Sequence, residues 1–317
     1  MTKVGFVGAG KIGSTSAYAT LSMVELTELV LIDIPPAKDL VEGEAMDLAA
    51  AAPAFGRNTK IVGGTDYELL RNCDIVVVSA GLPRKPGMTR LDLLQKNKVI
   101  IEDVCGKVKA VAPNCIFILV SNPVDVLLTI AHKRLGFPRN RVIGMSSLHD
   151  SVRLTGMLRE DTHDQHARGQ ILGEHGETMI AVPSMSRFPK NAQIDWSTIE
   201  SRVRQRAMDV IQRKGATVFA PAACTARMVR AVVQDTKEEI ASCVIVEGEY
   251  GLKDVSIGLP AVLGRNGLER VIEYPLTADE NKKLQTSADT IRKNIHEAMT
   301  PPPPAPAAPA PAPTPKA

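Results

Sequence analysis

A glycine-rich turn between an apolar run and a helical pattern is the strongest constraint on how this chain folds. Residues 8–13 read Gly-Ala-Gly-Lys-Ile-Gly, directly after the apolar run Lys3–Val7, and they open the helical pattern Lys11–Met23. In such a turn the first glycine permits the bend, the second lets the backbone approach a pyrophosphate, and the third lets the helix pack on the strand. Unpaired N–H groups and the helix dipole favour an anion at that position. The predicted dinucleotide site comprises Gly8, Ala9, Gly10, Lys11, Ile12 and Gly13.

Asp33 narrows the choice of cofactor. It follows the apolar run Leu29–Ile32, twenty residues past the last glycine of the turn. At this spacing an acidic residue can bond a ribose 2′-hydroxyl. Its charge would repel a 2′-phosphate, and the following Ile-Pro-Pro supplies no arginine to hold one. We therefore expect NAD rather than NADP. The alternative is that Asp33 only caps a turn before Pro35.

Short apolar runs alternate with helix-length patterns through the first half of the chain. The apolar runs are Val4–Val7, Leu29–Ile32, Ile75–Ser79 and Ile116–Val120, and the helical patterns are Lys11–Met23, Ala37–Ala51 and Arg90–Val111. Runs that are apolar on both faces fit a parallel sheet covered by helices on each side. We predict an α/β fold that begins with a Rossmann-type, doubly wound parallel sheet. Chain order alone does not give the strand order.

The pattern changes after Arg141–Gly144. Helical patterns at Ser146–Arg159, Ile199–Lys214, Ala222–Gln234 and Ala278–Ala298 alternate with strand-like runs at Gln170–Leu172, Thr178–Val182 and Ile240–Val246. This mixture predicts a C-terminal α+β substrate domain. A chain of 317 residues favours two domains over one. We expect an NAD-binding Rossmann domain at 1–144, a substrate and catalytic domain at 145–300, and a disordered tail at 301–317, which is almost entirely Pro and Ala.

Composition argues against several other classes of protein. The 38 basic and 35 acidic residues leave a charge of only +3, so we expect no nucleic-acid partner. No apolar run approaches the roughly 18 residues of a membrane span, and no signal peptide is recognisable, so we expect no membrane partner. Five cysteines without a C-x-x-C pair favour a reducing compartment, and we expect a cytoplasmic location. The His and Cys spacings predict no metal site.

Polar side chains follow the later apolar runs. The loop 81–90 comes directly after Ile75–Ser79 and carries Arg84 and Arg90, whose planar guanidinium groups suit carboxylates. Asn122 follows another such run. Because ligands bind at the carboxyl ends of parallel strands, these side chains are candidate ligand contacts. Taken alone, the basic loop fits a solvated surface as well, and Asn-Pro after a strand is often only a turn.

Three further residues could carry acid–base chemistry. Asp150 and Arg153 are three apart in the helical pattern Ser146–Arg159 and share a face, which by default indicates a surface pair. His175 lies in the turn Gly-Glu-His-Gly-Glu after an apolar run. Histidine titrates near neutral pH and can exchange a proton with a reacting hydroxyl group.

Six motifs together make the chain resemble the lactate/malate dehydrogenase family over about residues 3–298. They are GAGKIG at 8–13, LID at 31–33, AGLPRKPGMTR at 80–90, SNPVD at 121–125, DSVR at 150–153 and GEHG at 173–176. The chain is most similar to the lactate dehydrogenase-like malate dehydrogenases of bacteria. One departure is Ser146-Ser147-Leu148-His149, which replaces an Ala-Gly-Val-Leu-like run before the aspartate of the family.

The resemblance implies a catalytic pair. His175 would give and take the proton, and Asp150 would orient it and stabilise its charged form, which raises the pKa of the imidazole. Arg153 would bind the C1 carboxylate of the substrate as a bidentate pair. Arg90, on a loop that closes over the site, would be a further catalytic residue that polarises the substrate carbonyl.

The resemblance also implies contacts to the carbonyl oxygen and the cofactor. Asn122 would hydrogen-bond the same substrate oxygen as Arg90. Val120, Asn97 and Asn122 would lie beside the nicotinamide half of NAD. Members of the family are homodimers or homotetramers, and the helical patterns Ala37–Ala51 and Ala222–Gln234 are rich enough in small residues to pack across an interface.

Arg84 implies the substrate. Lactate enzymes of the family carry Gln at this position, and malate enzymes carry Arg, which pairs with the second carboxylate of oxaloacetate. An arginine left unpaired against pyruvate would cost on the order of 3 kcal/mol, about a hundredfold in preference. The implied reaction is reversible, NAD-dependent oxidation of (S)-malate. One alternative is oxidation of lactate or another 2-hydroxy acid, which Thr217 favours. Another is an inactive NAD-binding protein, although His175, Asp150 and Arg153 are all present.

Overall fold

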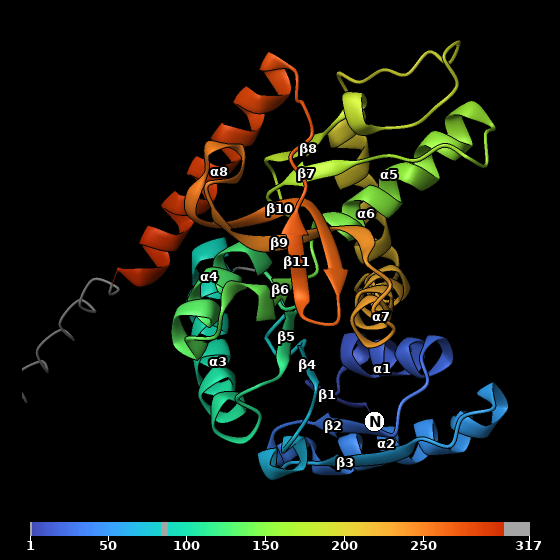
Figure 1. The fold of residues 1–317 in the computed structure, drawn as a ribbon, viewed down its shortest axis with the longest axis vertical. Coiled ribbons are helices and arrows are strands. Elements are labelled where there is room, and N and C mark those ends of the chain that lie inside the picture. The colour runs from blue at the N-terminus through green and yellow to red at the C-terminus, as the bar shows by residue number, and fades with distance from the viewer. Residues whose placement is uncertain (1, 84–87, 301–317) are drawn as a thin grey trace, which may run out of the picture.

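Parallel strand pairing organises the first half of the chain (Figure 1). The computed structural model describes residues 2–83 and 88–300. Its parallel strands are β1 (Lys3–Val7), β2 (Glu28–Ile32), β3 (Lys60–Gly64), β4 (Ile75–Val78), β5 (Ile116–Leu119) and β6 (Val142–Gly144). They pair in the order β3-β2-β1-β4-β5-β6. This is a dinucleotide-binding doubly wound order, in which the direction of winding reverses between β1 and β4. The predicted Rossmann sheet is confirmed.

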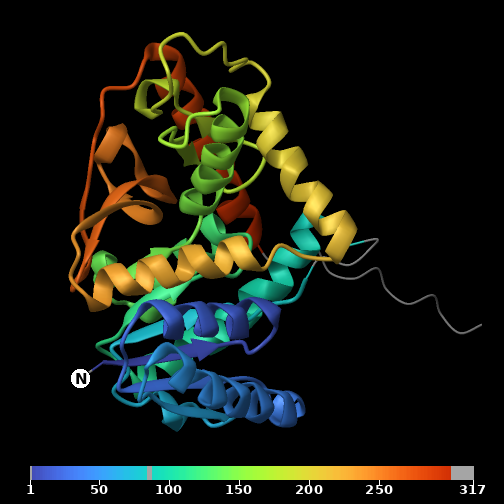
Figure 2. The ribbon, with the colours of Figure 1, turned by 90° about the vertical axis from the view of Figure 1, so that its right-hand side faces the viewer.

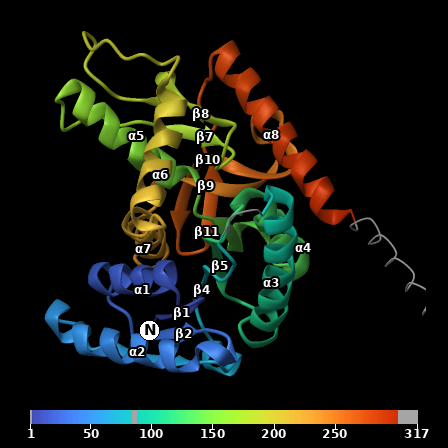
Figure 3. The same ribbon diagram turned by 180° about the vertical axis from the view of Figure 1, so that it is seen from behind.

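Helices cover this parallel sheet. They are α1 (Lys11–Met23), α2 (Lys38–Ala51), α3 (Arg90–Val111) and α4 (Val124–Leu135). The bounds of α1 and α3 agree with the prediction, and α2 begins one residue later. We did not predict β3 or α4 from the sequence. Helices α3 and α4 pack side by side (Figure 3), and α3 begins with a capping box in which Thr89 and Asp92 bond each other's backbone N–H groups.

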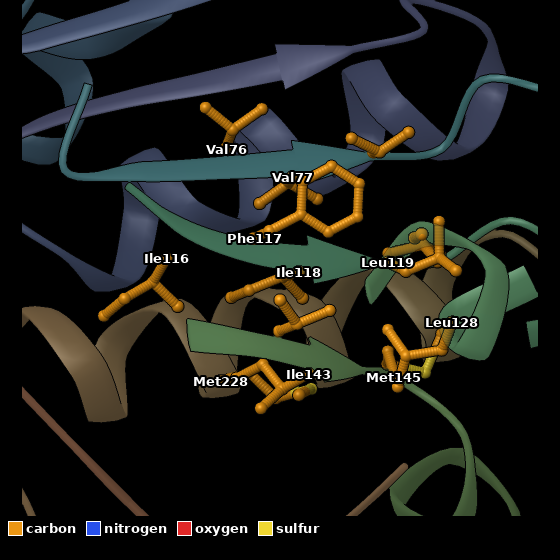
Figure 4. Packing of buried hydrophobic residues seen from close by; sticks show 14 of the residues in the cluster. Val76, Val77, Ile116, Phe117, Ile118, Leu119, Leu128, Ile143, Met145 and Met228 are labelled. Atoms are coloured by element: carbon orange, nitrogen blue, oxygen red, sulfur yellow. The ribbon is translucent and has the colours of Figure 1, made fainter. Parts of the chain in front are cut away.

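The core lies around the central strands. All residues of β4 and β5 are buried, which explains why their sequences are apolar on both faces. Figure 4 shows Val77, Phe117 and Ile118 on two adjacent strands of this core, with Met228 close to Ile143. Burying aliphatic side chains of this size contributes about 1.5–3 kcal/mol each.

Antiparallel strands extend the same sheet through the second half. They are β9 (Glu238–Glu247), β10 (Lys253–Gly264), β11 (Gly267–Val271), β7 (Ile171–Gly173) and β8 (Met179–Ala181). Strand β6 pairs with β9, β9 with β10, and β10 with both β11 and β7. The helices are α5 (Ser147–Thr162), α6 (Ile199–Lys214), α7 (Phe219–Val233) and α8 (Ala278–Met299). Short 3-10 turns occupy Pro35–Ala37, Ala52–Phe55, Tyr67–Leu70, Arg139–Arg141, Pro183–Met185 and Glu249–Gly251. The α+β prediction is confirmed, although β10 and β11 were not expected.

The two halves are packed together extensively. One hydrophobic cluster runs through both, and a smaller cluster around Leu154, Ile171 and Val203 belongs to the second half. Helix α7 lies along α1 (Figure 2), although the two are some 200 residues apart in sequence. The boundary near residue 144 stays a prediction, and the expected tail 301–317 lies outside the described residues.

The described residues contain no single helix of sufficient length and hydropathy to cross a membrane. Helices α6 and α7 reach that threshold only as a pair, which is bent by 115°. All five cysteines are buried and free.

Candidate active site

The three glycines of the turn 8–13 differ in what surrounds them. Gly8 has φ +99°, and a Cβ there would lie 2.7 Å from the backbone nitrogen of Ala80. A Cβ on Gly13 would lie 1.7 Å from the carbonyl oxygen of Gly8. A Cβ on Gly10 would meet no atom within 4 Å among the described residues. The first and third glycines are therefore required by packing within the protein, and the second faces open space where a phosphate can approach.

The surroundings of this turn suit NAD. Gly10 caps the N-terminus of α1 without a side-chain hydrogen bond to the first N–H groups, so these groups can bind an anion. The Oδ2 atom of Asp33 accepts the N–H of Ala9 at 2.7 Å, and its Oδ1 atom accepts the N–H of Ile34 at 2.7 Å. The carboxylate thus lies beside the glycine turn, and its remaining lone pairs can accept ribose hydroxyls.

Asn97 joins two loops at the carboxyl end of the sheet. It is buried, its Oδ1 accepts the N–H of Leu82 at 2.8 Å, and its Nδ2 donates to the carbonyl oxygen of Asn122 at 2.8 Å. The loop after β4 is thereby held against the loop after β5. Val120 is buried at the end of β5, and the Oδ1 atom of Asn122 accepts the N–H of Val124 at 3.3 Å.

Asp150, on α5, connects His175 and Arg153. Its Oδ2 lies 2.6 Å from Nδ1 of His175, and its Oδ1 accepts Nη1 of Arg153 at 3.0 Å. Asp150 is fully buried, while the side chains of His175 and Arg153 are 19% and 12% exposed. The default interpretation of Asp150 and Arg153 as a surface pair is wrong, because strands β7 and β9 pack against α5 and both side chains are largely buried. A carboxylate buried without partners would be strongly destabilising, and here both oxygens are bonded.

The electrostatics of this cluster favour a charged imidazole. Burial alone would lower the pKa of His175, but the charge of Asp150, its hydrogen bond and the charge of Asp125 outweigh burial and raise the pKa above its ordinary value. Burial would raise the pKa of Asp150, and the neighbouring His175 and Arg153 reverse that effect, so its pKa falls. Asp150 therefore stays ionised at a pH at which His175 can gain or lose a proton.

Asp125 holds the backbone of His175. At the start of α4, its Oδ2 accepts the N–H of His175 at 2.7 Å. Burial raises the pKa of Asp125 to about 6, against the opposing hydrogen bond and charge of His175. Gly173, two residues before His175, pairs with Gly258 of β10. A side chain at Gly258 would clash with Ser147. We did not single out Asp125 from the sequence, although it ends the SNPVD motif.

His149 is a second residue that sequence reasoning missed. It is only 4% exposed, and its Nε2 lies 2.9 Å from Nη2 of Arg153. Its ring centroid lies 5.9 Å from that of His175. The signal available in the sequence was the departure from the apolar run that precedes the aspartate in the family.

Ligand atoms of His149, Asp150 and His175 lie within 4.8 Å of one another, as in a metal site. Both oxygens of Asp150 are already engaged, and the guanidinium of Arg153 occupies the same cluster. A metal ion would have to replace the guanidinium of Arg153 at Asp150, and the positive charge of that guanidinium would repel it. These side chains therefore suit proton exchange and carboxylate binding better than metal binding.

The predicted substrate arginines of the loop 81–90 cannot be placed in the same way. Arg84 lies outside the described residues. Arg90 begins α3, but its side chain lies outside the described part of the structure. The structure thus brings together His175, Asp150 and Arg153.

Two family models together cover nearly all of the sequence. The lactate/malate dehydrogenase, NAD binding domain matches residues 2–144, and the lactate/malate dehydrogenase, alpha/beta C-terminal domain matches residues 148–300. The chain belongs to the lactate/malate dehydrogenase family. Its first half is accordingly an NAD-binding domain, as the glycine turn and Asp33 predict.

Individual members of the lactate/malate dehydrogenase family are similar over almost their full length. Malate dehydrogenase of Archaeoglobus fulgidus is 47% identical over 295 residues, which span 93% of this chain and 99% of that protein. Malate dehydrogenase of Cytophaga hutchinsonii is 38% identical, covering 94% of this chain and 96% of that protein. The solved structure of the Archaeoglobus enzyme in complex with NADH has a TM-score of 0.88 at 46% identity, covering 94% and 99% of the two chains. A lactate dehydrogenase from a deep-sea metagenome library has a TM-score of 0.86 at 33% identity, covering 94% and 98%.

Proposed function

We propose that this chain is an NAD-dependent malate dehydrogenase, which interconverts (S)-malate and oxaloacetate with His175 as acid and base. The observation that carries the proposal is the 2.6 Å contact between Nδ1 of His175 and Oδ2 of the fully buried Asp150. Support for the substrate comes from relatives named malate dehydrogenase at 38–47% identity.

The contact supports Nε2 as the nitrogen of His175 that reacts. Because Asp150 is ionised, Nδ1 carries the proton that bonds it, and Nε2 is left to exchange a proton with the substrate hydroxyl. Bound NAD would supply the hydride acceptor for malate and, in its reduced form, the hydride donor for oxaloacetate. During malate oxidation, Nε2 takes the hydroxyl proton as the carbonyl forms, and Asp150 stabilises the resulting imidazolium.

The remaining roles concern the substrate and the cofactor. We assign binding of the C1 carboxylate to Arg153. Arg90 would stabilise the charge that develops on the carbonyl oxygen, and Asn122 would donate a hydrogen bond to the same oxygen. The second carboxylate is assigned to Arg84. NAD would be held by the glycine turn and Asp33, with Val120 and Asn97 on the nicotinamide side.

Substrate choice is tested by comparing oxaloacetate, pyruvate and buffer in an NADH-oxidation assay. We expect oxaloacetate to be preferred over pyruvate by about a hundredfold in kcat/KM. Arg84→Gln should move that ratio toward pyruvate. Lactate dehydrogenase activity is the second candidate, favoured by Thr217 and by the metagenomic lactate dehydrogenase at 33% identity. A higher kcat/KM for pyruvate in the wild type would establish it and remove the malate assignment.

We also propose that the chain forms a homodimer or homotetramer. Exposed apolar side chains on α2, among them Leu40 and Met46, and Phe219 at the start of α7 support an interface. Most of α7 beyond Phe219 is buried within the chain, so α2 is the better candidate surface. Light scattering after size-exclusion chromatography measures the assembly state. The cytoplasmic location stays a prediction from the sequence.

A further inference from the structure

Two neighbours on α5 hold the guanidinium of Arg153 from opposite ends of its planar fork. Nη1 donates to Oδ1 of Asp150 at 3.0 Å, and Nη2 lies 2.9 Å from Nε2 of His149. These partners are three and four residues before Arg153, so one helical face presents all three side chains. The two bonds engage both terminal nitrogens of the fork and leave up to three of its five N–H groups for a ligand.

The contact with Arg153 fixes the protonation of His149. A guanidinium has only donors, so Nε2 of His149 must be the acceptor, and the proton of the neutral ring must be on Nδ1. The charges that face this ring come from Arg153 and Asp150 on α5 and from His175 after β7. Burial, together with Arg153 and His175, lowers the pKa of His149 to about 3. His149 is therefore a neutral acceptor at any pH at which the enzyme would work.

We propose that His149 is a positioning residue that, together with Asp150, locks Arg153 in the orientation that receives the C1 carboxylate of the substrate. The inference rests on the proposed function, because it takes Arg153 as the carboxylate-binding residue. If Asp150 were its only partner, the guanidinium of Arg153 could still rotate about that one hydrogen bond. The second anchor removes this freedom before the substrate arrives and so lowers the ordering cost of binding.

The separate roles of the two anchors distinguish this inference from general support of the fold. Asp150 bonds both His175 and Arg153, so its loss affects proton transfer and binding together. His149 bonds Arg153 and lies 5.9 Å, ring to ring, from His175. Loss of His149 should therefore weaken substrate binding and leave the chemical step largely intact.

The test compares His149→Phe, which keeps a planar ring and removes the acceptor, with His149→Gln, whose amide oxygen can accept from Arg153. For His149→Phe we expect KM for oxaloacetate and the inhibition constant of hydroxymalonate, an inert 2-hydroxy dicarboxylate, to rise about tenfold. The value of kcat should stay within about threefold, and the Kd of NADH should not change. His149→Gln should recover most of the lost affinity.

The outcomes distinguish failure of the locking role of His149 from failure of the proposed function. If the wild type turns over oxaloacetate and His149→Phe retains the wild-type KM and inhibition constant, the locking role is refuted. It is refuted as well if His149→Gln loses as much affinity as His149→Phe. Should His149→Phe unfold at the assay temperature, His149→Leu, which restores an apolar residue, provides the same comparison. A wild type inactive toward oxaloacetate and pyruvate would instead overturn the proposed function, and the inference with it.

Discussion

The backbone N–H of His175 donates to the buried carboxylate of Asp125 at 2.7 Å. Asp125 lies at the start of α4 in the nucleotide-binding half, whereas the ring of His175 is held by Asp150 on α5 in the other half. The position of the ring is therefore set by one carboxylate from each half of the chain. This arrangement links helix α4 of the nucleotide-binding half directly to His175, the proposed acid–base residue.

Asp125 should make the stability of the protein depend on pH. Its pKa in the folded state is about 6, against 3.8 for an ordinary aspartate. Its stabilising contribution is therefore fully present below about pH 4 and is lost as pH rises to about 6, a change of up to about 3 kcal/mol. Asp125→Asn keeps an acceptor for His175 and cannot ionise. We expect the free energy of unfolding of this variant, relative to wild type, to increase between pH 4.5 and pH 7 in urea titrations. A constant difference across that range would contradict the assignment.

Asp150→Asn should shift the pH dependence of the rate of oxaloacetate reduction to lower pH. The carboxylate raises the pKa of His175, so its removal lowers that pKa. Reduction of oxaloacetate requires protonated His175, and its rate therefore falls as pH rises through the pKa. In the variant we expect this fall at a lower pH than in wild type, and a kcat reduced by about a hundredfold or more. Steady-state rates across pH measure both effects, and an unshifted profile would argue against the pair.

His175→Gln should abolish proton exchange while leaving the cofactor site intact. We expect kcat to fall by a factor of about 10²–10⁴, with the Kd of NADH within about twofold of wild type. Fluorescence titration with NADH supplies the second measurement. Near-normal turnover would show that another group transfers the proton.

The glycine turn offers a matched pair of substitutions. In Gly13→Ala the new methyl group would collide with the carbonyl oxygen of Gly8, so we expect a loss of thermal stability together with weak NADH binding. Gly10→Ala meets no described atom within 4 Å, so it should fold normally and still bind NADH at least tenfold more weakly, because the methyl group occupies the phosphate approach. If Gly10→Ala binds NADH as wild type does, the phosphates lie elsewhere.

The sequence predicted the nucleotide half well because its signals are local. A glycine turn, an acidic strand end and fully apolar strands such as β4 and β5 are visible within short windows. Strand β3 was missed because it ends in two glycines and is only partly buried. Strand β10 was missed because Pro260 and Gly258, both unfavourable inside a strand, interrupt its apolar run.

The contacts among His175, Asp150 and Arg153 could not be predicted from their spacing in the sequence alone. The burial of Asp150 was missed because an acidic residue on a helix is usually exposed, although Leu154, Met157 and Leu158 follow it on the same face of α5. The roles of His175 and Asp150 came from the family motifs. The contact of His149 with Arg153 depends on the orientation of side chains on one helix, which becomes visible only in coordinates.

The packing of α7 along α1 has a consequence for protein engineering. Helix α1, which follows the glycine turn of the NAD-binding domain, is covered by α7 from the second half of the chain. A chimera that exchanges only residues 1–144 between relatives would place a foreign α1 beneath the native α7. Chimeras made between members of this family should therefore exchange α1 and α7 together, as one unit.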